Sequence, residues 1–117
     1  MRFKRLRHRV SKYNVRTDAI GKAARTSDGI LFGSKLERRY YDQLKIKQAA
    51  GDVLCFLIQV PIRLPGPTKY VVDFVEFLAN GEVRFVDVKG TETDMFILKK
   101  KQVEDLYPFK IEVVTEI

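Results

Sequence analysis

The sequence has one cysteine, one histidine and no long apolar stretch. Because Cys55 is the only thiol among 117 residues, an internal disulfide is excluded, and we expect a reducing, cytoplasmic setting. A membrane-spanning helix needs about 20 apolar residues, and no run approaches that length, so we expect no membrane partner. The basic N-terminus lacks the apolar segment of a secretory signal. His8 stands alone in that basic run, and we assign it no catalytic role.

Positive charge is concentrated at one end of the chain. Residues 1–28 contain nine basic and two acidic side chains and so account for the whole net charge of +7, whereas residues 29–117 carry equal numbers of each sign. We expect residues 1–28 to form a basic arm that contacts nucleic-acid phosphates, and residues 29–117 to form a single domain. The arm residues expected to make these contacts are Arg2, Lys4, Arg5, Arg7 and Arg9. The alternative interpretation is a solvated tail.

Two apolar runs with embedded charges carry the main functional signal. Residues 70–78 and 83–89 are rich in β-branched and aromatic side chains, which predicts two strands. Strict alternation places Asp73 on a face with the apolar residues 71, 75 and 77, and places Asp87 and Lys89 on a face with residues 83 and 85. Burying a carboxylate without a partner is costly. A divalent metal between the two acids would supply the compensating charge.

The loop between these strands decides whether the two acids meet. The sequence Ala79-Asn80-Gly81 is typical of a hairpin. A two-residue turn would place the side chains of Asp73 and Asp87 on opposite faces, because a slip of one residue reverses every side chain. A three-residue loop with a left-handed Gly81 pairs position 78 with position 82 and sets the two acids directly across from each other. We predict this second register.

The remaining patterns predict an α+β fold with a mixed sheet flanked by helices. We expect a helix over residues 34–50, strands over 53–64, 70–78 and 83–89, a second helix opening at 90–94 and ending near 106, and a last strand over 109–113. The element order is then αβββαβ, in a single layered domain.

Each candidate residue also has an ordinary structural interpretation. The Ser34-Lys35-Leu36-Glu37 segment fits a capping box, in which Glu37 caps its own helix. Asp73 could be an acid on an edge strand, and Asp87 with Lys89 a surface ion pair. Gln59, a polar residue within an apolar strand, fits a substrate contact or simple edge exposure. The run of lysines at 99–101 is typical of a solvated helix face.

The ordered set resembles a known family. Glu37 on a helix, Asp73 on a strand and Asp87-Val88-Lys89 after a hairpin resemble the PD-(D/E)xK nuclease superfamily, whose restriction-endonuclease-like core has the order αβββαβ. The resemblance covers roughly residues 30–115. The Gly33-Ser34-x-x-Glu37-Arg38 segment is further similar to archaeal-type Holliday-junction resolvases and their phage relatives. The chain departs from the name motif at Val72, where the family has proline, and at Asp87, where glutamate is commoner.

The resemblance implies a magnesium-dependent endonuclease that cleaves branched DNA, with Mn²⁺ as a substitute metal. Asp73, Asp87 and the Val88 carbonyl would hold Mg²⁺, Glu37 would reach the same site, and Lys89 would act on the attacking water and the phosphate. Further DNA contacts are expected from Ser34, Arg38, Lys99 and Lys100. Symmetric cleavage of a junction implies a homodimer. A nicking, flap or restriction-like nuclease and a non-catalytic nucleic-acid-binding subunit stay open as alternatives. A phage-encoded enzyme of this kind would act in the host cytoplasm.

Overall fold

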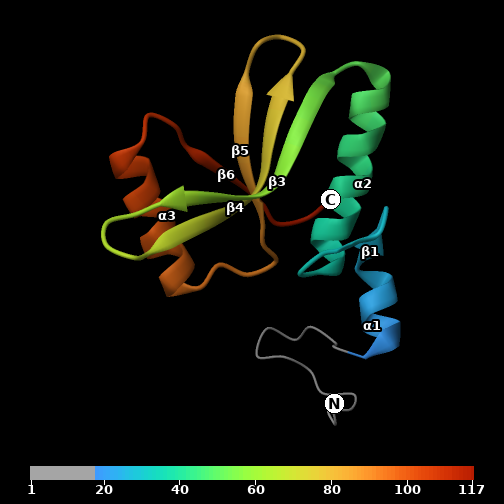
Figure 1. The fold of residues 1–117 in the computed structure, drawn as a ribbon, viewed down its shortest axis with the longest axis horizontal. Coiled ribbons are helices and arrows are strands. Elements are labelled where there is room, and N and C mark those ends of the chain that lie inside the picture. Colours follow the sequence, from blue (N-terminus) through green and yellow to red (C-terminus); the bar gives the residue numbers. More distant parts are fainter. Residues whose placement is uncertain (1–17) are drawn as a thin grey trace.

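A computed structural model describes residues 18–117 of the chain (Figure 1). Within these residues the chain forms three helices and six strands, in an α+β fold. In chain order they are α1 (Ala19–Ala24), β1 (Thr26–Ser27), β2 (Ile30–Leu31), α2 (Lys35–Ala50), β3 (Val53–Arg63), β4 (Lys69–Leu78), β5 (Val83–Val88), α3 (Asp94–Leu106) and β6 (Ile111–Val114). The predicted αβββαβ order is confirmed by α2 through β6. The basic residues Arg2, Lys4, Arg5, Arg7 and Arg9 lie outside the described part of the chain.

The main sheet has four strands in the order β3-β4-β5-β6. The first two pairings are antiparallel, whereas β5 and β6 run parallel. Parallel neighbours need a crossover, and α3 supplies it between β5 and β6. The predicted mixed sheet is therefore confirmed. Among the helices in residues 18–117, none is long and apolar enough to cross a membrane.

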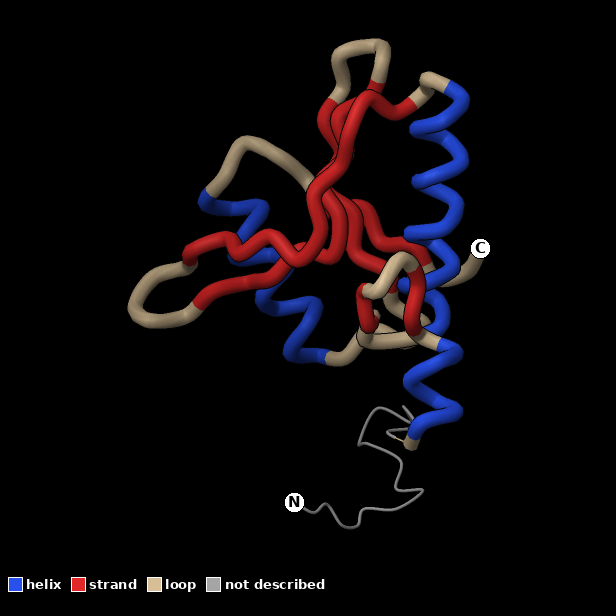
Figure 2. The backbone as a smooth tube through the Cα atoms, turned by 45° about the vertical axis from the view of Figure 1, so that its right-hand side comes forward, coloured by secondary structure: helices blue, strands red, loops and turns tan. Residues whose placement is uncertain are grey.

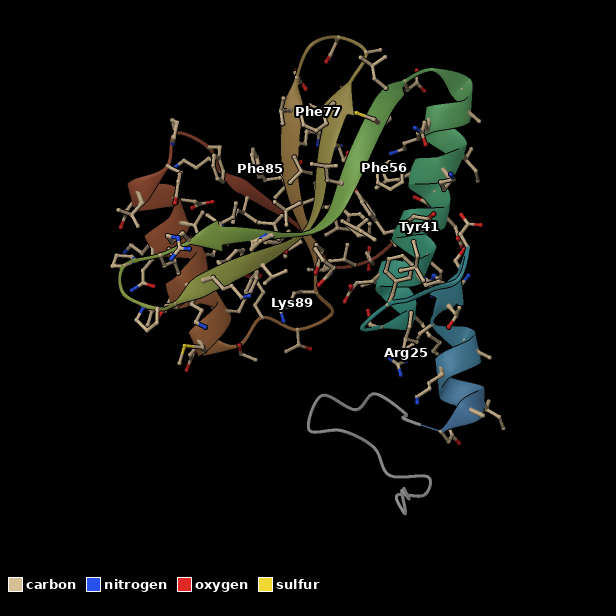
Figure 3. The ribbon with its side chains drawn as sticks, in the orientation of Figure 1. Arg25, Tyr41, Phe56, Phe77, Phe85 and Lys89 are labelled. Carbon is tan, nitrogen blue, oxygen red and sulfur yellow. The ribbon has the colours of Figure 1, made fainter. Side chains whose placement is uncertain are left out.

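Two apolar cores hold the helices to the sheet. The α2 core is built from Phe32, Tyr40, Tyr41, Leu44, Val53, Phe74, Val86 and Val88. The α3 core is built from Leu64, Tyr70, Val72, Val75, Phe96, Val103 and Ile111. Full burial of one such aliphatic or phenylalanine side chain contributes about 1.5–3 kcal/mol. Figure 3 shows one contact of the first core, in which Tyr41 of α2 meets Phe56 of β3 edge to face, with ring centroids 5.7 Å apart.

The last part of the predicted basic arm folds against α2. Asp28 and Gly29 have φ values of 51° and 77°, which suit the tight turn joining β1 to β2. Arg25 is buried there, and its Nη1 donates to the Phe32 carbonyl at 2.8 Å. Arg38 of α2 donates through Nε to the Ala24 carbonyl at 3.0 Å. Ala24 and Arg25, which belong to the predicted arm, therefore contact α2 and the segment just before it.

The β3–β4 hairpin bends where it leaves the rest of the sheet (Figures 1 and 2). The two strands stay paired beyond β5, and we call the paired segment of residues 60–72, with its loop, the distal hairpin. On β4, Val72 packs in the α3 core whereas Phe74 packs in the α2 core. Strict alternation would have kept the two side chains on one face.

The bend corrects one expectation from the sequence. We had placed Val71 on the same apolar face as Val75, yet Val71 is 40% exposed while its neighbour Val72 is fully buried. The physical reason is that the covered side of β4 changes at the bend. Asp73 lies at this change, between Val72 of the α3 core and Phe74 of the α2 core.

An ionic network centred on the buried Glu76 helps to fix α2 against the sheet. Glu76 of β4 is only 1% exposed, and it accepts a hydrogen bond from the Tyr40 hydroxyl of α2. Arg84 of β5 lies 3.5 Å from Glu76 and makes two hydrogen bonds to Glu112 of β6, at 2.9 and 2.6 Å. Unpaired buried charges are strongly destabilising, so this network sets the position of α2. Glu37 lies one helical turn before Tyr40 and is positioned with it.

Candidate active site

Asp73 and Asp87 occupy opposite positions on β4 and β5. The pairs Phe74–Val86 and Phe77–Val83 set the register, and continuing it by one position places Asp73 across from Asp87. The Leu78 N–H donates to the Glu82 carbonyl at 2.9 Å, and Gly81 is left-handed with φ 94°. The predicted three-residue loop is therefore confirmed, and with it the register that brings the two acids together.

Both carboxylates are held by hydrogen bonds. Asp73 accepts from the Val88 N–H at 2.9 Å through Oδ2 and from Gln59 Nε2 at 3.3 Å through Oδ1. Asp87 accepts from the Asp73 N–H at 3.0 Å through Oδ1 and from the Tyr70 hydroxyl through Oδ2. The two acids are thus tied to each other's strands. Their side-chain orientations are set by donors on three elements of the fold.

Glu37, in the first turn of α2, interacts electrostatically with the same acids. Ser34 caps this helix, and its Oγ accepts from the Glu37 N–H at 3.1 Å. The Glu37 carboxylate accepts from the Gly33 backbone N–H. A Cβ atom on Gly33 would lie 2.8 Å from Glu37 Oε1, so a side chain at this position would displace the carboxylate. Half of the predicted capping box is present, and the Glu37 carboxylate also interacts electrostatically with Asp73 and Asp87.

Burial raises the pKa values of all three acids, and repulsion between the acids adds to the shifts of Glu37 and Asp73. Burial and then the negative charge of Asp73 raise the pKa of Glu37 to about 7. Burial, with a further contribution from Asp87, raises the pKa of Asp73 to about 6. Burial also raises the pKa of Asp87, which is 3% exposed. A cation among these carboxylates would relieve this unfavourable concentration of negative charge.

Lys89 supplies positive charge beside the acids. It follows β5 directly, and its N–H donates to the Val114 carbonyl at 2.9 Å. The Lys89 charge offsets part of the rise in the pKa values of Glu37, Asp73 and Asp87. Its ammonium also lies 5.1 Å from the centroid of the Phe96 ring, in a cation–π contact. In Figure 3 the side chain projects below the crossing of the strands.

The donor chemistry of this cluster suits a magnesium ion, since Mg²⁺ prefers hard carboxylate and carbonyl oxygens. The arrangement of the described side chains, in contrast, does not form a metal site in this structure. Within residues 18–117, no group of three or more histidine, cysteine, aspartate or glutamate side chains is arranged to hold a metal. The Asp73 and Asp87 oxygens point to protein donors, although each carboxylate oxygen has a second lone pair. The set of Asp73, Asp87, Val88 and Glu37 therefore stays a prediction.

Four other residues predicted to contact DNA lie on α2, at its N-cap or on α3, and three of them have partners within the protein. Arg38 forms an ion pair with Asp42 at 2.7 Å in addition to its bond to Ala24. Lys100 lies 3.1 Å from Glu104. Ser34 is engaged as the cap of α2, and Lys99 is half-buried on α3. The DNA contacts of these four residues stay predictions.

Two contributors to the site were missed in the sequence. Tyr70 lies three residues before Asp73 and was assigned to the apolar run, but its hydroxyl donates to Asp87. A buried tyrosine hydroxyl usually has a hydrogen-bond partner, and that rule was the available signal. Phe96 gave no signal in the sequence, because it is an ordinary apolar residue of a helix.

The fold and the acid cluster define an α+β protein with a charged site at the bend of a mixed sheet. The chain belongs to the family described as "Protein of unknown function (DUF1064)", whose model matches residues 10–115. Searches of the curated proteins and of the solved structures gave no significant match.

Proposed function

We propose that this protein is a magnesium-dependent DNA endonuclease of the PD-(D/E)xK type. The observation that carries the proposal is the β4–β5 register, which sets Asp73 across from Asp87. Glu37 and Lys89 interact electrostatically with this pair, from α2 and from the end of β5. The buried Asp87, the half-buried Asp73, a third acid and a lysine form the set expected from the resemblance. DNA binding alone gains nothing from carboxylates that face phosphates.

The chemistry is hydrolysis of a phosphodiester. Mg²⁺ held by Asp73, Asp87 and the Val88 carbonyl would polarise the phosphate and lower the pKa of a bound water. The water oxygen forms a bond to phosphorus as the bond to the 3′ oxygen breaks. The attacking water loses one proton to solvent and the leaving oxygen takes one from solvent, so the products are a 5′-phosphate and a 3′-hydroxyl. The Lys89 ammonium stabilises the negative charge that grows on the phosphate oxygens.

The preferred substrate in this proposal is a four-way DNA junction. The Gly33-Ser34-x-x-Glu37-Arg38 segment and its likeness to Holliday-junction resolvases support this choice. The basic residues before residue 17 would add phosphate contacts that position DNA without reading its sequence. Symmetric cleavage requires two sites, so the working unit is a homodimer. A phage-encoded resolvase would act on branched DNA in the host cytoplasm.

A cleavage assay tests the proposal. The purified chain is incubated with four-way junction, flap and linear duplex DNA in Mg²⁺, in Mn²⁺ and in chelator. We expect paired nicks in the junction with either metal and none in chelator. Preference for the flap or the duplex would favour the nicking, flap or restriction-like alternative. Binding without cleavage of any substrate would favour the non-catalytic subunit.

A further inference from the structure

Gln59 has an unusual backbone conformation in the middle of a strand. In residues 18–117 the non-glycine residues with positive φ are Asp28 and Gln59, both at 51°. Asp28 sits in the tight turn between β1 and β2, where such a value is ordinary. Gln59 instead lies within β3, between residues that pair regularly with β4. Left-handed backbone in a non-glycine residue persists only where the surroundings enforce it, and it is often found at functional sites.

The side chain of Gln59 points to the candidate active site. The pairs Ile58–Phe74 and Val60–Val72 place Gln59 opposite Asp73 at the bend of the hairpin. Its Nε2 donates to Asp73 Oδ1 at 3.3 Å, and this contact lowers the pKa of Asp73. The other oxygen of Asp73 is held by the Val88 N–H at 2.9 Å. One donor from each neighbouring strand therefore fixes the plane of this carboxylate.

We propose that Gln59 is a positioning residue that orients the Asp73 carboxylate, an inference that rests on the proposed nuclease function. The left-handed backbone at the bend aims the amide at Asp73. The amide then holds Oδ1 while the Val88 N–H holds Oδ2, so the carboxylate enters the reaction already oriented. In the sequence Gln59 was a possible substrate contact; the bond to Asp73 gives its amide a role inside the protein.

The competing explanation is that residue 59 has only a structural role, which is to let β3 bend. In that case the backbone conformation matters and the amide does not. Glycine separates the two explanations, because it adopts a positive φ without steric cost and has no side chain. Asparagine also tolerates the left-handed region and keeps an amide. Glutamate keeps the length of the side chain but replaces the donor with a second carboxylate facing Asp73.

The experiment compares Gln59→Gly, Gln59→Asn and Gln59→Glu with the wild-type chain. Three quantities are measured: the unfolding temperature in chelator, Mg²⁺ affinity by calorimetry, and kcat and KM for a four-way junction. Leu57→Gly is the control, because Leu57 is an exposed residue of the same strand without a positive φ. Leu57→Gly should lower the unfolding temperature and leave kcat unchanged.

We expect Gln59→Gly to unfold at or above the wild-type temperature while its kcat falls about ten-fold to a hundred-fold, the usual effect of a misplaced reacting group. Its KM should stay within about two-fold, because the substitution removes no contact that binds the substrate and the transition state equally. Gln59→Asn should recover part of the lost kcat. Gln59→Glu should lose more kcat than Gln59→Gly, because its carboxylate repels Asp73.

Several outcomes would overturn the inference. Wild-type kcat in Gln59→Gly would show that the amide is dispensable. A parallel loss of unfolding temperature and kcat in that variant would mark a purely structural role. Both results leave the nuclease proposal standing, because the wild-type chain still cleaves DNA. A wild-type chain that neither cleaves DNA nor binds Mg²⁺ overturns the proposed function, and this inference with it.

Discussion

Asp73 and Asp87 face each other across β4 and β5, and each accepts a backbone N–H from the other's strand. Asp87 Oδ1 accepts from the Asp73 N–H at 3.0 Å, and Asp73 Oδ2 accepts from the Val88 N–H at 2.9 Å. Such bonds stabilise ionised carboxylates, yet burial raises the pKa values of both acids. The site therefore holds two carboxylates in place at some cost in stability. A cation bound by the two carboxylates would offset this cost.

The first prediction concerns this acid pair. Asp73→Asn and Asp87→Asn should each lower the cleavage rate by about a thousand-fold or more, because the metal's contribution is several kcal/mol and 1.4 kcal/mol is a factor of ten. Junction affinity should stay the same or increase, since a charge that repels phosphate is removed. Cleavage in Mg²⁺ and binding in chelator are measured. Asp105→Asn, at an exposed residue of α3, is the control for charge removal. Full activity of both site variants would refute the assignment.

The second prediction concerns Lys89. Lys89→Ala should reduce kcat far more than it weakens junction binding, because the ammonium stabilises charge that grows in the transition state. Arginine should restore little activity, since its planar guanidinium does not replace a compact ammonium. The cation–π contact with Phe96 at 5.1 Å further suits the lysine geometry. Single-turnover rates and binding isotherms are compared for the three chains. Equal losses of rate and affinity would instead mark Lys89 as a simple phosphate contact.

The third prediction separates the two roles of Glu37. Glu37→Gln should fold normally, because the cap on α2 is the Ser34 hydroxyl, which accepts from a backbone N–H that the substitution keeps. The variant should lose most cleavage, since it removes a carboxylate that repels Asp73 and would attract a metal. Unfolding temperature and cleavage rate are measured together. A fully active Glu37→Gln would assign Glu37 to helix capping alone.

The sequence was sufficient for the element order and for the meeting of the two acids. Asn80-Gly81 with its flanking apolar runs predicted the hairpin, and the need to bring Asp73 and Asp87 together selected the three-residue loop. Such local rules work because a side-chain period of two leaves few registers. Ser34 and Thr93 likewise fulfil the capping pattern at the starts of α2 and α3.

The bend in the β3–β4 hairpin could not be predicted, because it depends on which helix covers each half of the strands. Val71 was placed in the apolar face by alternation, but α3 packs on Val72 instead. The left-handed Gln59 has the same origin, since nothing in its identity favours a positive φ. Tyr70 and Phe96 joined the site through tertiary packing. Their roles become visible only when the fold brings Tyr70 to Asp87 and Phe96 to Lys89.

The fourth prediction concerns acid stability. Glu104 of α3 accepts from the Ile111 N–H at 2.8 Å, and Lys100 lies 3.1 Å away. Burial raises the pKa of Glu104, but these two partners outweigh it and hold the pKa below the ordinary value. A lowered pKa stabilises the fold above the unfolded-state pKa, and this contribution is lost as the pH falls through the folded-state pKa. Glutamine removes the charge at every pH.

Glu104→Gln should therefore lower the unfolding free energy by about 1 kcal/mol at pH 7, a charge-assisted bond discounted for partial exposure. The difference from wild type should close as the pH falls below about 4, where the unfolded-state carboxyl is protonated. Urea unfolding at a series of pH values measures it. Glu92→Gln, at an exposed residue, is the control. A difference that widened on acidification would contradict the pKa direction.

The last prediction concerns the basic residues at the start of the chain. Deleting residues 1–16 removes Arg2, Lys4, Arg5, Arg7, Arg9, Lys12 and Arg16. The deletion keeps Asp18, which caps α1 by accepting from the Gly21 N–H at 2.9 Å, so the described fold should persist. Each lost phosphate contact should flatten the dependence of log affinity on log salt by about 0.9 for duplex DNA.

Junction affinity over a salt series, for the intact and truncated chains, measures this effect. Affinity should fall strongly at moderate salt, whereas the rate at saturating enzyme should change little, because the deletion keeps the acid cluster and Lys89. A full-length chain with the same seven residues changed to glutamine should match the truncation, which separates charge from length. Identical salt slopes in all three chains would show that residues 1–16 make no phosphate contacts. The phosphate contacts would then have to come from Arg38, Arg39 and the lysines at 99–101.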